Sequence, residues 1–432
     1  MKYFNKTLIA VSVALISGQT LAAGFQLNSQ SATGIGRAFA GDAVIADNAS
    51  VLSRNPAAMA LFDKAAISVG VTTVDVQVDI KDVNFMGGQV DLGGIDDAGS
   101  VKWIPNIYYI QPLNDKWAVG FAAFSNFGTG TDSASLVNSK TVAAPYDLIG
   151  NTEVTTINFN TSVSYRINDM LSLGVGLDLV YGEGNLDRYY NQMPLVDVDA
   201  DGWGIGGIVG ATLELNENNR FGLSYRYSPN VDVSGHIATL TPLPGQTPGQ
   251  TNSFASTLFD ELEVPLADIF QLAGFHQLTE NFAVHYTAQY TRWGNFDQIT
   301  AKDGVSSIYG TGTVIANNVN APLKQYQWKN SWLMSVGGTY DINEQFTVRA
   351  GYMFDNGVVD EISSISIPDS DRQWFTAGLS YHINQHQTID FGMAFVKGEE
   401  VELVENSAVV GPVNAITKSE AMYYSVQYSY QF

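Results

Sequence analysis

Alternating apolar and polar residues constrain the fold of this chain more than any other feature of its sequence. In the segment 157–167, the odd positions are mostly apolar or aromatic and the even positions are Asn, Ser or Arg. A similar pattern follows in 171–181, and again in 203–215 and 221–227. A period of two is typical of β-strands with one apolar and one polar face. The chain from residue 66 onward is therefore predicted to be all-β.

Two kinds of polar connection separate these segments. Long stretches rich in Gly, Asp and Ser are predicted to be loops near residues 82–99, 129–152, 190–200, 236–255, 300–324, 358–370 and 402–419. Short turns lie between them at residues 113–115, 168–169, 217–219, 279–281, 343–344 and 384–385. Short turns at one end and long loops at the other are typical of outer-membrane barrels. We count about fourteen strands, an even number that lets the first and last strands pair and leaves no open edge in lipid. The predicted fold is an all-β, antiparallel transmembrane β-barrel over residues 65–432.

The N-terminus has the features of a secretory signal peptide. Lys2 and Lys6 precede an apolar run from Thr7 to Ile16, and small residues end at Ala22. Such a segment is too short for a membrane-spanning helix and is removed on export. We expect residues 1–22 to be the signal peptide, with cleavage after Ala22 or one residue away from it.

Charge and composition exclude several classes of protein. The chain has 21 Lys and Arg against 43 Asp and Glu, a net charge of −22, which argues against a nucleic-acid partner. It has no cysteine, so it has neither a disulfide framework nor thiolate metal ligands. Hydrophobic residues are 45% of the chain and aromatic residues 12%, so it is not disordered. No apolar run after the signal peptide reaches the roughly 20 residues of a spanning helix.

The last strand alternates aromatic residues and ends at Phe432. A terminal aromatic residue after such alternation resembles the signal that barrel-assembly machinery recognises. Tyr and Trp rings are expected near both membrane interfaces, where their half-polar character fits. These features predict a multi-pass protein of the Gram-negative outer membrane, in contact with outer-membrane lipid.

Residues 23–64 differ from the rest of the chain. Alternation is absent, small residues dominate, and the segment ends in Arg54-Asn55-Pro56-Ala57. A fourteen-stranded barrel has a lumen wide enough to leak unless something fills it. We therefore expect this segment to fold back into the lumen as an N-terminal hatch, and not to hang outside the barrel.

Several short motifs resemble the FadL family of long-chain fatty acid transporters. They lie at residues 23–28, 34–38, 45–48, 53–57, 103–106, 125–128, 219–221 and 366–372. The similarity covers nearly the whole mature chain, and the long loops diverge. The resemblance implies a fourteen-stranded barrel with a hatch, an extracellular capture groove and an internal acyl pocket. It also implies passive uptake by a monomer, with lateral exit at a kinked third strand and no energy-coupling partner.

The resemblance also assigns roles to individual residues. Arg188 and Lys329 match positions that approach the ligand's head group in the family, because a carboxylate needs a cation or hydrogen-bond donors. The alternative is that each cation pairs with acidic loop neighbours such as Asp187. Phe25 is implied to lie beside the acyl pocket, where movement of the N-terminus opens the site. It could equally be a hydrophobic anchor, and the two roles do not exclude each other.

Two motifs are predicted to control the hatch and the wall. Asn55-Pro56-Ala57 is read as a structural turn, since Pro fixes φ and Asn supports turn hydrogen bonds. The resemblance makes this turn the hatch anchor. Asn126, Phe127 and Gly128 interrupt a strand, and glycine within a strand often marks a bend. A plain strand end also explains this pattern, whereas the resemblance favours a lateral opening.

No catalytic, cofactor or metal site is predicted. The acidic stretch Asp197–Asp201 resembles the start of a calcium loop, but Ile208 stands where the bidentate Glu belongs. The five histidines are scattered, and a polar lumen position is expected for His285. An outer-membrane lipase would need a nucleophile, a base and an orienting group, which the sequence does not offer.

The expected function is passive uptake of long-chain fatty acids across the bacterial outer membrane, without enzyme activity. The main alternative is a related channel for aromatic or other small hydrocarbons, which would not need Arg188 and Lys329. A general diffusion porin is a further alternative, and it would conduct ions where a plugged barrel conducts few.

Overall fold

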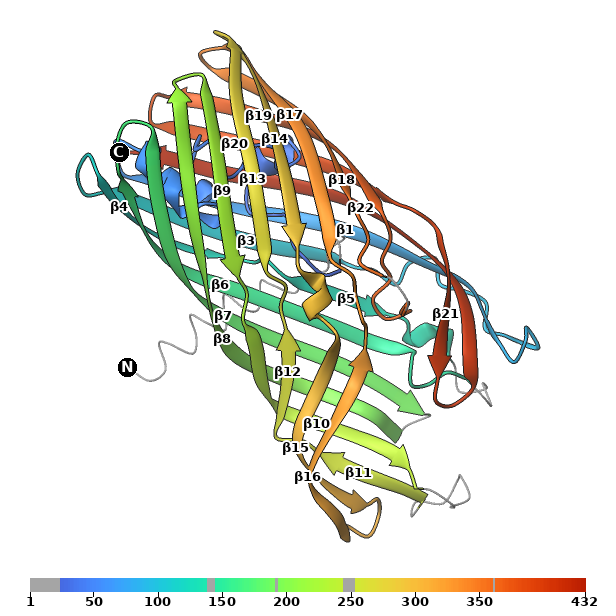
Figure 1. Cartoon of the computed structure of the whole chain (residues 1–432). Helices are drawn as coiled ribbons and strands as arrows, with labels where there is room; N and C mark the ends of the chain where they lie inside the picture. Colours follow the sequence, from blue (N-terminus) through green and yellow to red (C-terminus); the bar gives the residue numbers. More distant parts are fainter. Residues whose placement is uncertain (1–23, 138–143, 191–192, 244–252, 360–361) are drawn as a thin grey trace.

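The computed structural model describes residues 24–137, 144–190, 193–243, 253–359 and 362–432. The predicted signal peptide, residues 1–22, lies outside them. The described chain forms a closed antiparallel β-barrel of 14 strands around an N-terminal segment (Figure 1). None of the helices in these ranges has both the length and the apolar character needed to cross a membrane.

Several of the fourteen wall strands are built from two or three shorter strands in succession. In chain order the strands are β1 (Ala66–Phe85), β2 (Val90–Asp91), β3 (Val101–Pro112), β4 (Trp117–Phe124), β5 (Gly128–Asp132), β6 (Gly150–Arg166), β7 (Leu171–Tyr190), β8 (Met193–Asn216), β9 (Asn219–Tyr227), β10 (Asn230–Pro242), β11 (Phe254–Leu258), β12 (Glu261–Pro265), β13 (Ile269–Thr279), β14 (Phe282–Thr291), β15 (Gln298–Ile308), β16 (Val314–Gln325), β17 (Ser331–Asn343), β18 (Phe346–Asp355), β19 (Arg372–Asn384), β20 (Gln387–Gly398), β21 (Val401–Ser407) and β22 (Gly411–Gln431). β1 pairs with β3 on one side and with β22 on the other, which closes the barrel.

All six predicted short turns are confirmed, because each separates two consecutive strands. The prediction of long loops was wrong over much of 190–200, 300–324 and 402–419, where β7, β8, β15, β16, β21 and β22 continue as paired strands. Pairing of the backbone needs no apolar side chain, so polar composition alone does not end a strand. The Asp197–Asp201 stretch is consequently part of β8 and not a loop.

The outer face of the barrel carries exposed apolar side chains in the middle of its strands. Leu177 and Ile205, for example, are 60% and 67% exposed. Aromatic pairs with an exposed Trp and a half-buried Tyr flank this belt, Trp117–Tyr165 near the short turns and Tyr181–Trp203 toward the long-loop end. An apolar band between two aromatic girdles is the surface that a bilayer requires.

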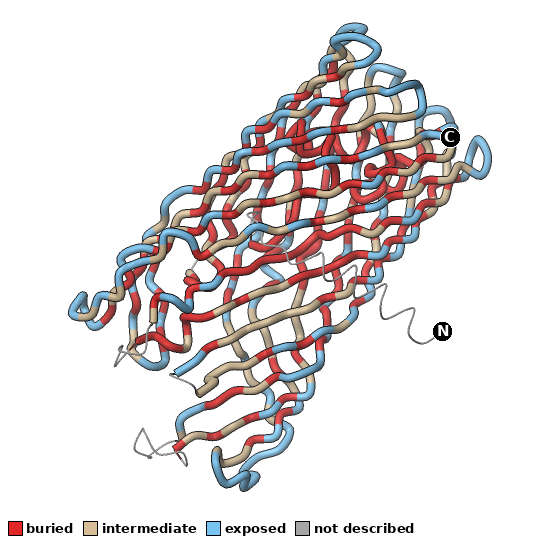
Figure 2. Tube along the Cα trace, turned by 180° about the vertical axis from the view of Figure 1, so that it is seen from behind, coloured by how far each residue is buried: buried red, intermediate tan, exposed pale blue. Residues whose placement is uncertain are grey.

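Residues 24–62 lie inside the barrel and are almost entirely buried (Figure 2). They contain the short helix α2 (Ala32–Gly36) and the 3₁₀ helices η1 (Ala49–Ser53) and η2 (Pro56–Leu61). In Figure 1 these blue helices occupy the end of the barrel that carries the C-terminus and the short turns. We call residues 24–64 the hatch.

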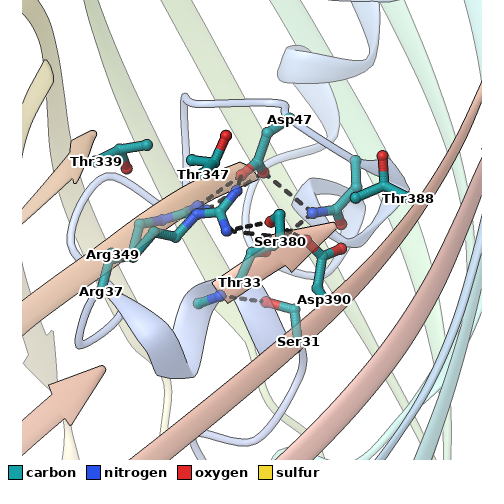
Figure 3. A network of polar contacts seen from close by, with 12 residues as sticks. Ser31, Thr33, Arg37, Asp47, Thr339, Thr347, Arg349, Ser380, Thr388 and Asp390 are labelled. Carbon is teal, nitrogen blue, oxygen red and sulfur yellow. Dashed lines mark hydrogen bonds and ion pairs between the residues drawn. The ribbon is translucent and has the colours of Figure 1, made fainter. Parts of the chain in front are cut away.

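An ionic network joins the hatch to the wall (Figure 3). Arg37 lies 2.8 Å from Asp42 and 2.7 Å from Asp47. Asp47 also meets Arg349 of β18 at 3.4 Å, and Arg349 approaches Asp390 of β20 at 3.8 Å. Burial by itself would raise the pKa of Asp47, but Arg37 and Arg349 lower it to about 2. Asp47 is therefore ionised at physiological pH.

Asn55-Pro56-Ala57 presses directly against the backbone of the wall. Asn55 is fully buried, accepts from the Ala57 N–H at 3.0 Å and donates to the carbonyl of Ala211 at 3.0 Å. A Cβ on Gly174 of β7 would lie 2.3 Å from the Ala57 nitrogen, and one on Gly210 of β8 2.0 Å from the Asn55 side chain. Only glycine at these two positions lets the turn approach so closely.

Gly174→Ala is expected to destabilise the protein by about 1–3 kcal/mol, because its methyl group would displace the 55–57 turn. Gly184→Ala in the same strand is a matched control, since the nearest atom to its Cβ would be 3.8 Å away. Urea unfolding of the detergent-solubilised protein measures both, with hydrogen exchange of the turn as a local readout. Equal stability of the two variants would show that the hatch is not seated on this wall.

Candidate ligand site and wall opening

Phe25 lies at the centre of a cage of aromatic rings. Its ring centroid is 4.8 Å from that of Trp293, 5.1 Å from Phe296 and 5.8 Å from both Phe127 and Trp328. Most of these contacts are edge-to-face, a geometry that aromatic quadrupoles favour. Phe25 is 1% exposed, so the cage buries it almost completely.

The residue before Phe25 is tied to the long segment between β18 and β19. The Gly24 N–H donates to Asp369 at 3.3 Å, and Asp369 also accepts from the Val358 N–H and pairs with Arg372. Burial raises the pKa of Asp369 above its ordinary value, although Arg372 opposes the shift. The first residue of the hatch, Gly24, is thus bound to the segment between β18 and β19.

A narrow apolar cavity of about 50 Å³ adjoins the cage on the long-loop side of Phe25. Phe25 and Phe296 form part of its lining. Aliphatic side chains of the wall strands complete it, including Val154, Leu186, Val198, Val231 and Leu262. Such a volume holds a few water-sized groups, so a longer ligand fits only if Phe25 moves.

Arg188 is linked to this cavity through Thr152, one of its lining residues. It is 3% exposed, and its guanidinium donates to the carbonyls of Asn151 and Asp187 at 2.6 and 2.7 Å and to the Thr152 hydroxyl at 2.7 Å. Thr152 itself lines the cavity. Among the residues that the structure describes, no carboxylate lies within 4.0 Å of this cation. Arg188 is therefore a buried positive charge held by neutral acceptors.

The structure does not bring Lys329 to the same place. Its side chain is exposed, and its backbone N–H donates to Val358 at 2.8 Å. Lys329 is not among the residues that line the cavity, although its neighbours Tyr326 and Trp328 are buried in the cavity wall and the cage. Neither cation is itself a lining residue, but of the two only Arg188 is buried and bonded to a residue that lines the cavity, Thr152.

Asn126, Phe127 and Gly128 lie at an interruption of the third wall strand. β4 ends at Phe124 and β5 begins at Gly128. β3 pairs with β4 through residues 107–112, whereas in the described ladders β5 pairs with β6 alone. In the described ladders, the backbone of β3 from Val101 to Asn106 consequently has no hydrogen-bonded neighbouring strand on this side. We call this break between β3 and β5 the wall gap.

The N-terminal segment covers the wall gap from inside. The Gly128 N–H donates to the Phe25 carbonyl at 2.8 Å, and the Leu27 N–H donates to the Asn126 carbonyl at 2.6 Å. Gln26 and Phe127 form an isolated antiparallel bridge. Phe25 is thus brought together with Phe127 and Gly128, while Asn55-Pro56-Ala57 contacts β7 and β8 instead.

Sequence reasoning missed the cage residues Trp293, Phe296 and Trp328, and the tie from Asp369 to Gly24. The aromatic residues carried a signal, because they cluster just after β14 and just before β17. Aromatic residues near strand ends also occur in the girdles at the membrane interfaces, so their positions in the sequence could not distinguish a cage inside the barrel from a girdle outside it. Asp369 and Arg372 belong to a motif that was noticed only for its family resemblance.

Comparisons with known proteins agree with this architecture. Residues 13–432 match the family described as outer membrane protein transport protein (OMPP1/FadL/TodX). A long-chain fatty acid transport protein of Escherichia coli O6:H1 is 30% identical, with 99% of each chain covered. Outer membrane protein P1 of Haemophilus influenzae is also 30% identical, covering 99% of this chain and 97% of its own.

Solved structures share the fold. A Pseudomonas aeruginosa FadL homologue superimposes with a TM-score of 0.75 at 23% identity, over 95% of this chain and 100% of its own. The Pseudomonas putida toluene transporter TodX gives a TM-score of 0.65 at 16% identity, over 96% and 100% of the two chains. Barrel, hatch and sequence match together show that this chain is an outer-membrane protein that belongs to the OMPP1/FadL/TodX family of transport proteins.

Proposed function

We propose that this protein takes up long-chain fatty acids across the outer membrane by passive diffusion, without covalent chemistry. The observation that carries the proposal is Arg188, a buried cation with no carboxylate within 4.0 Å, which donates to Thr152 in the lining of an apolar cavity. An isolated buried charge is costly unless an anion or several donors and acceptors compensate it. A fatty acid supplies both parts of the complement, a carboxylate for Arg188 and an acyl chain for the cavity.

The acyl chain would gain its affinity from burial. Each methylene removed from water contributes about 0.8 kcal/mol. The cavity is too small for a long chain while Phe25 fills the cage, so ligand and ring compete for the same space. The Phe25 carbonyl accepts from Gly128 at the wall gap, so a ligand that shifts the Phe25 backbone together with its ring would break this contact. Ligand binding and opening of the gap are thereby coupled through one residue.

Lateral exit through the wall gap is the route we infer. The hatch closes the lumen below the cavity and is pressed onto the wall at Asn55-Pro56-Ala57. Phe127 of the gap accepts from Thr156 of β6, and the next residue, Ile157, pairs with Tyr181. Since Tyr181 belongs to the aromatic girdle at the long-loop end, the gap lies at the level of that girdle. A hydrophobic ligand that leaves there enters lipid directly. It never has to cross the polar hatch.

Lys329 fits an earlier step of the same path. It is exposed near the cavity wall at the long-loop end, where it would attract a carboxylate before Arg188 receives it. Exposed charges act mainly through steering, which salt screens.

An alternative is transport of aromatic or other small hydrocarbons. The aromatic cage around Phe25 would stack such ligands, and solved structures with the same fold include toluene transporters. A hydrocarbon has no carboxylate, however, and would leave Arg188 without a counter-ion. The charge requirement therefore favours fatty acids.

Arg188→Met is expected to weaken oleate binding roughly tenfold to a hundredfold, since a charge-assisted hydrogen bond contributes about 1.5–3 kcal/mol. Toluene binding should stay unchanged. Lys302→Met removes another extracellular cation, one held by Glu261 and Glu263, and serves as the matched control. Calorimetric titration of the purified protein measures both ligands. Undiminished oleate binding in Arg188→Met, alone and with Lys329→Met, would sink the head-group assignment.

Phe25→Ala is expected to raise oleate affinity several-fold, because the acyl chain no longer has to displace the ring from the cage. Quenching of the neighbouring Trp293 and Trp328 fluorescence reports occupancy of the cage directly. Phe25→Tyr keeps the ring and should behave like the parent protein. Weaker binding in Phe25→Ala would mean that the ring is part of the ligand's contact surface and not a competitor for it.

A further inference from the structure

Six arginines are buried among the described residues, and four of them have carboxylate partners. The four are Arg37 with Asp42 and Asp47, Arg226 with Asp178, Arg349 with Asp47 and Asp390, and Arg372 with Asp355 and Asp369. Arg188 and Arg54 have none within 4.0 Å. The proposed function uses Arg188. It leaves Arg54, in the hatch, as a second buried cation without a counter-ion.

Arg54 is held by neutral side chains. It is 7% exposed, and its Nη2 donates to Gln30 at 2.6 Å and to Asn28 at 3.2 Å. The Nε–H has no hydrogen-bond partner. Burial lowers the pKa of Arg54, but an arginine remains protonated. Of the charged groups near it, Asp42 is committed to Arg37, and Arg226 is committed to Asp178.

Other unpaired hydrogen-bond donors lie on the two segments to which Asn28 and Gln30 connect this cation. The side-chain Nδ2 atoms of Asn28 and Asn126 and the hydroxyls of Ser29 and Ser125 are buried and have no partner. The orientation of both amides is set, because the Asn28 oxygen accepts from Arg54 and the Asn126 oxygen accepts from Gln30 at 3.2 Å. Both NH₂ groups are thus left to donate. A buried set of one guanidinium, two amides and two hydroxyls is complementary to an oxyanion.

These groups lie on the inner side of the wall gap. Gln30 links the two halves of the set, since it accepts from Arg54 and donates to the Ser125 carbonyl at 2.8 Å. Asn106, on the free edge of β3, donates to the Ser29 carbonyl at 3.5 Å. Asn126 is followed directly by Phe127, whose ring meets Phe25 in the cage. The set therefore adjoins the aromatic cage.

We propose that Asn28, Ser29, Arg54, Ser125 and Asn126 form an exit site that binds the fatty acid's carboxylate while its acyl chain leaves through the wall gap. The inference rests on the proposed function and extends it to a second head-group site. A carboxylate that left Arg188 for an apolar passage would have no partner, which costs several kcal/mol. The exit site supplies that partner and makes the passage selective for acids over hydrocarbons.

Asn28→Asp tests the exit site with an almost isosteric change. The new carboxylate would sit at the position of the Asn28 oxygen that accepts from Arg54, so it neutralises the cation inside the protein and repels the substrate's carboxylate. We expect the initial rate of oleate uptake to fall roughly tenfold, the loss of about one charge-assisted hydrogen bond. Uptake is measured with labelled oleate in Gram-negative cells whose only transporter of this family is the variant.

Methyl oleate is the matched control ligand, because it has the same acyl chain and no charge. Its uptake should be unchanged in Asn28→Asp, and the affinity of the purified variant for oleate at the Arg188 cavity should also be unchanged. Asn281→Asp adds the same charge at an exposed short turn and should leave both uptake rates as they are. Arg54→Met, checked by thermal unfolding for an intact barrel, should reproduce the selective loss of oleate uptake.

The outcomes separate the two proposals. If Asn28→Asp takes up oleate and methyl oleate at the parent rates, the exit site is wrong although the proposed function stands. If both substrates slow equally, the substitution has disturbed the wall gap, and selectivity for the head group is also rejected. If the parent protein neither binds nor takes up oleate, the proposed function itself fails.

Discussion

Backbone hydrogen bonding within the wall is the constraint on which the rest of this structure depends. In lipid every N–H and C=O needs a partner inside the protein, so a spanning sheet has to close. β1 and β22 meet that requirement along almost their whole length. The break between β3 and β5 is an exception, and the chain's own N-terminal segment supplies hydrogen bonds to the kink there. The segment that seals the gap also carries Phe25 into the cage, so sealing the wall and closing the cavity are done by the same few residues.

The charges in the lumen divide into two groups with different consequences. Arg37, Arg226, Arg349 and Arg372 have carboxylate partners. Arg349 fastens Asp47 of the hatch to the wall, and Arg372 fastens Asp369 of the long segment before β19. Removing one partner of such a buried pair costs about 3–5 kcal/mol, so these contacts are fixed in place. Arg54 and Arg188 are held only by neutral groups, which leaves them able to meet an anion. In the function we propose, Arg188 serves the cavity and Arg54 serves the wall gap.

The fold could be predicted from the sequence because it depends on local patterns. Alternation over segments such as 157–167 and 171–181 determines which face of each strand meets lipid, and the short polar turns determine where strands reverse. The same local reasoning failed in 190–200, where a stretch with Asn, Pro and Asp was taken for a loop although β7 and β8 continue. Cross-strand pairing above the membrane depends on neighbours in space, which composition does not report. The wall gap was only one of two interpretations of Asn126-Phe127-Gly128 until the partners of β3 and β5 were known.

The sequence by itself determined the class of fold, the approximate strand number, the hatch and the family, because period, turn chemistry and motifs are written along the chain. Only the tertiary structure decided which cations matter. Arg188, Lys329 and Arg54 are alike in sequence, as basic residues among polar neighbours, yet one is exposed and two are buried. Whether a cation can bind an external anion depends on its burial and on the carboxylates within reach, and both depend on residues distant in the chain. For the same reason Trp293, Phe296 and Trp328 became a cage around Phe25 only when the barrel closed around the hatch.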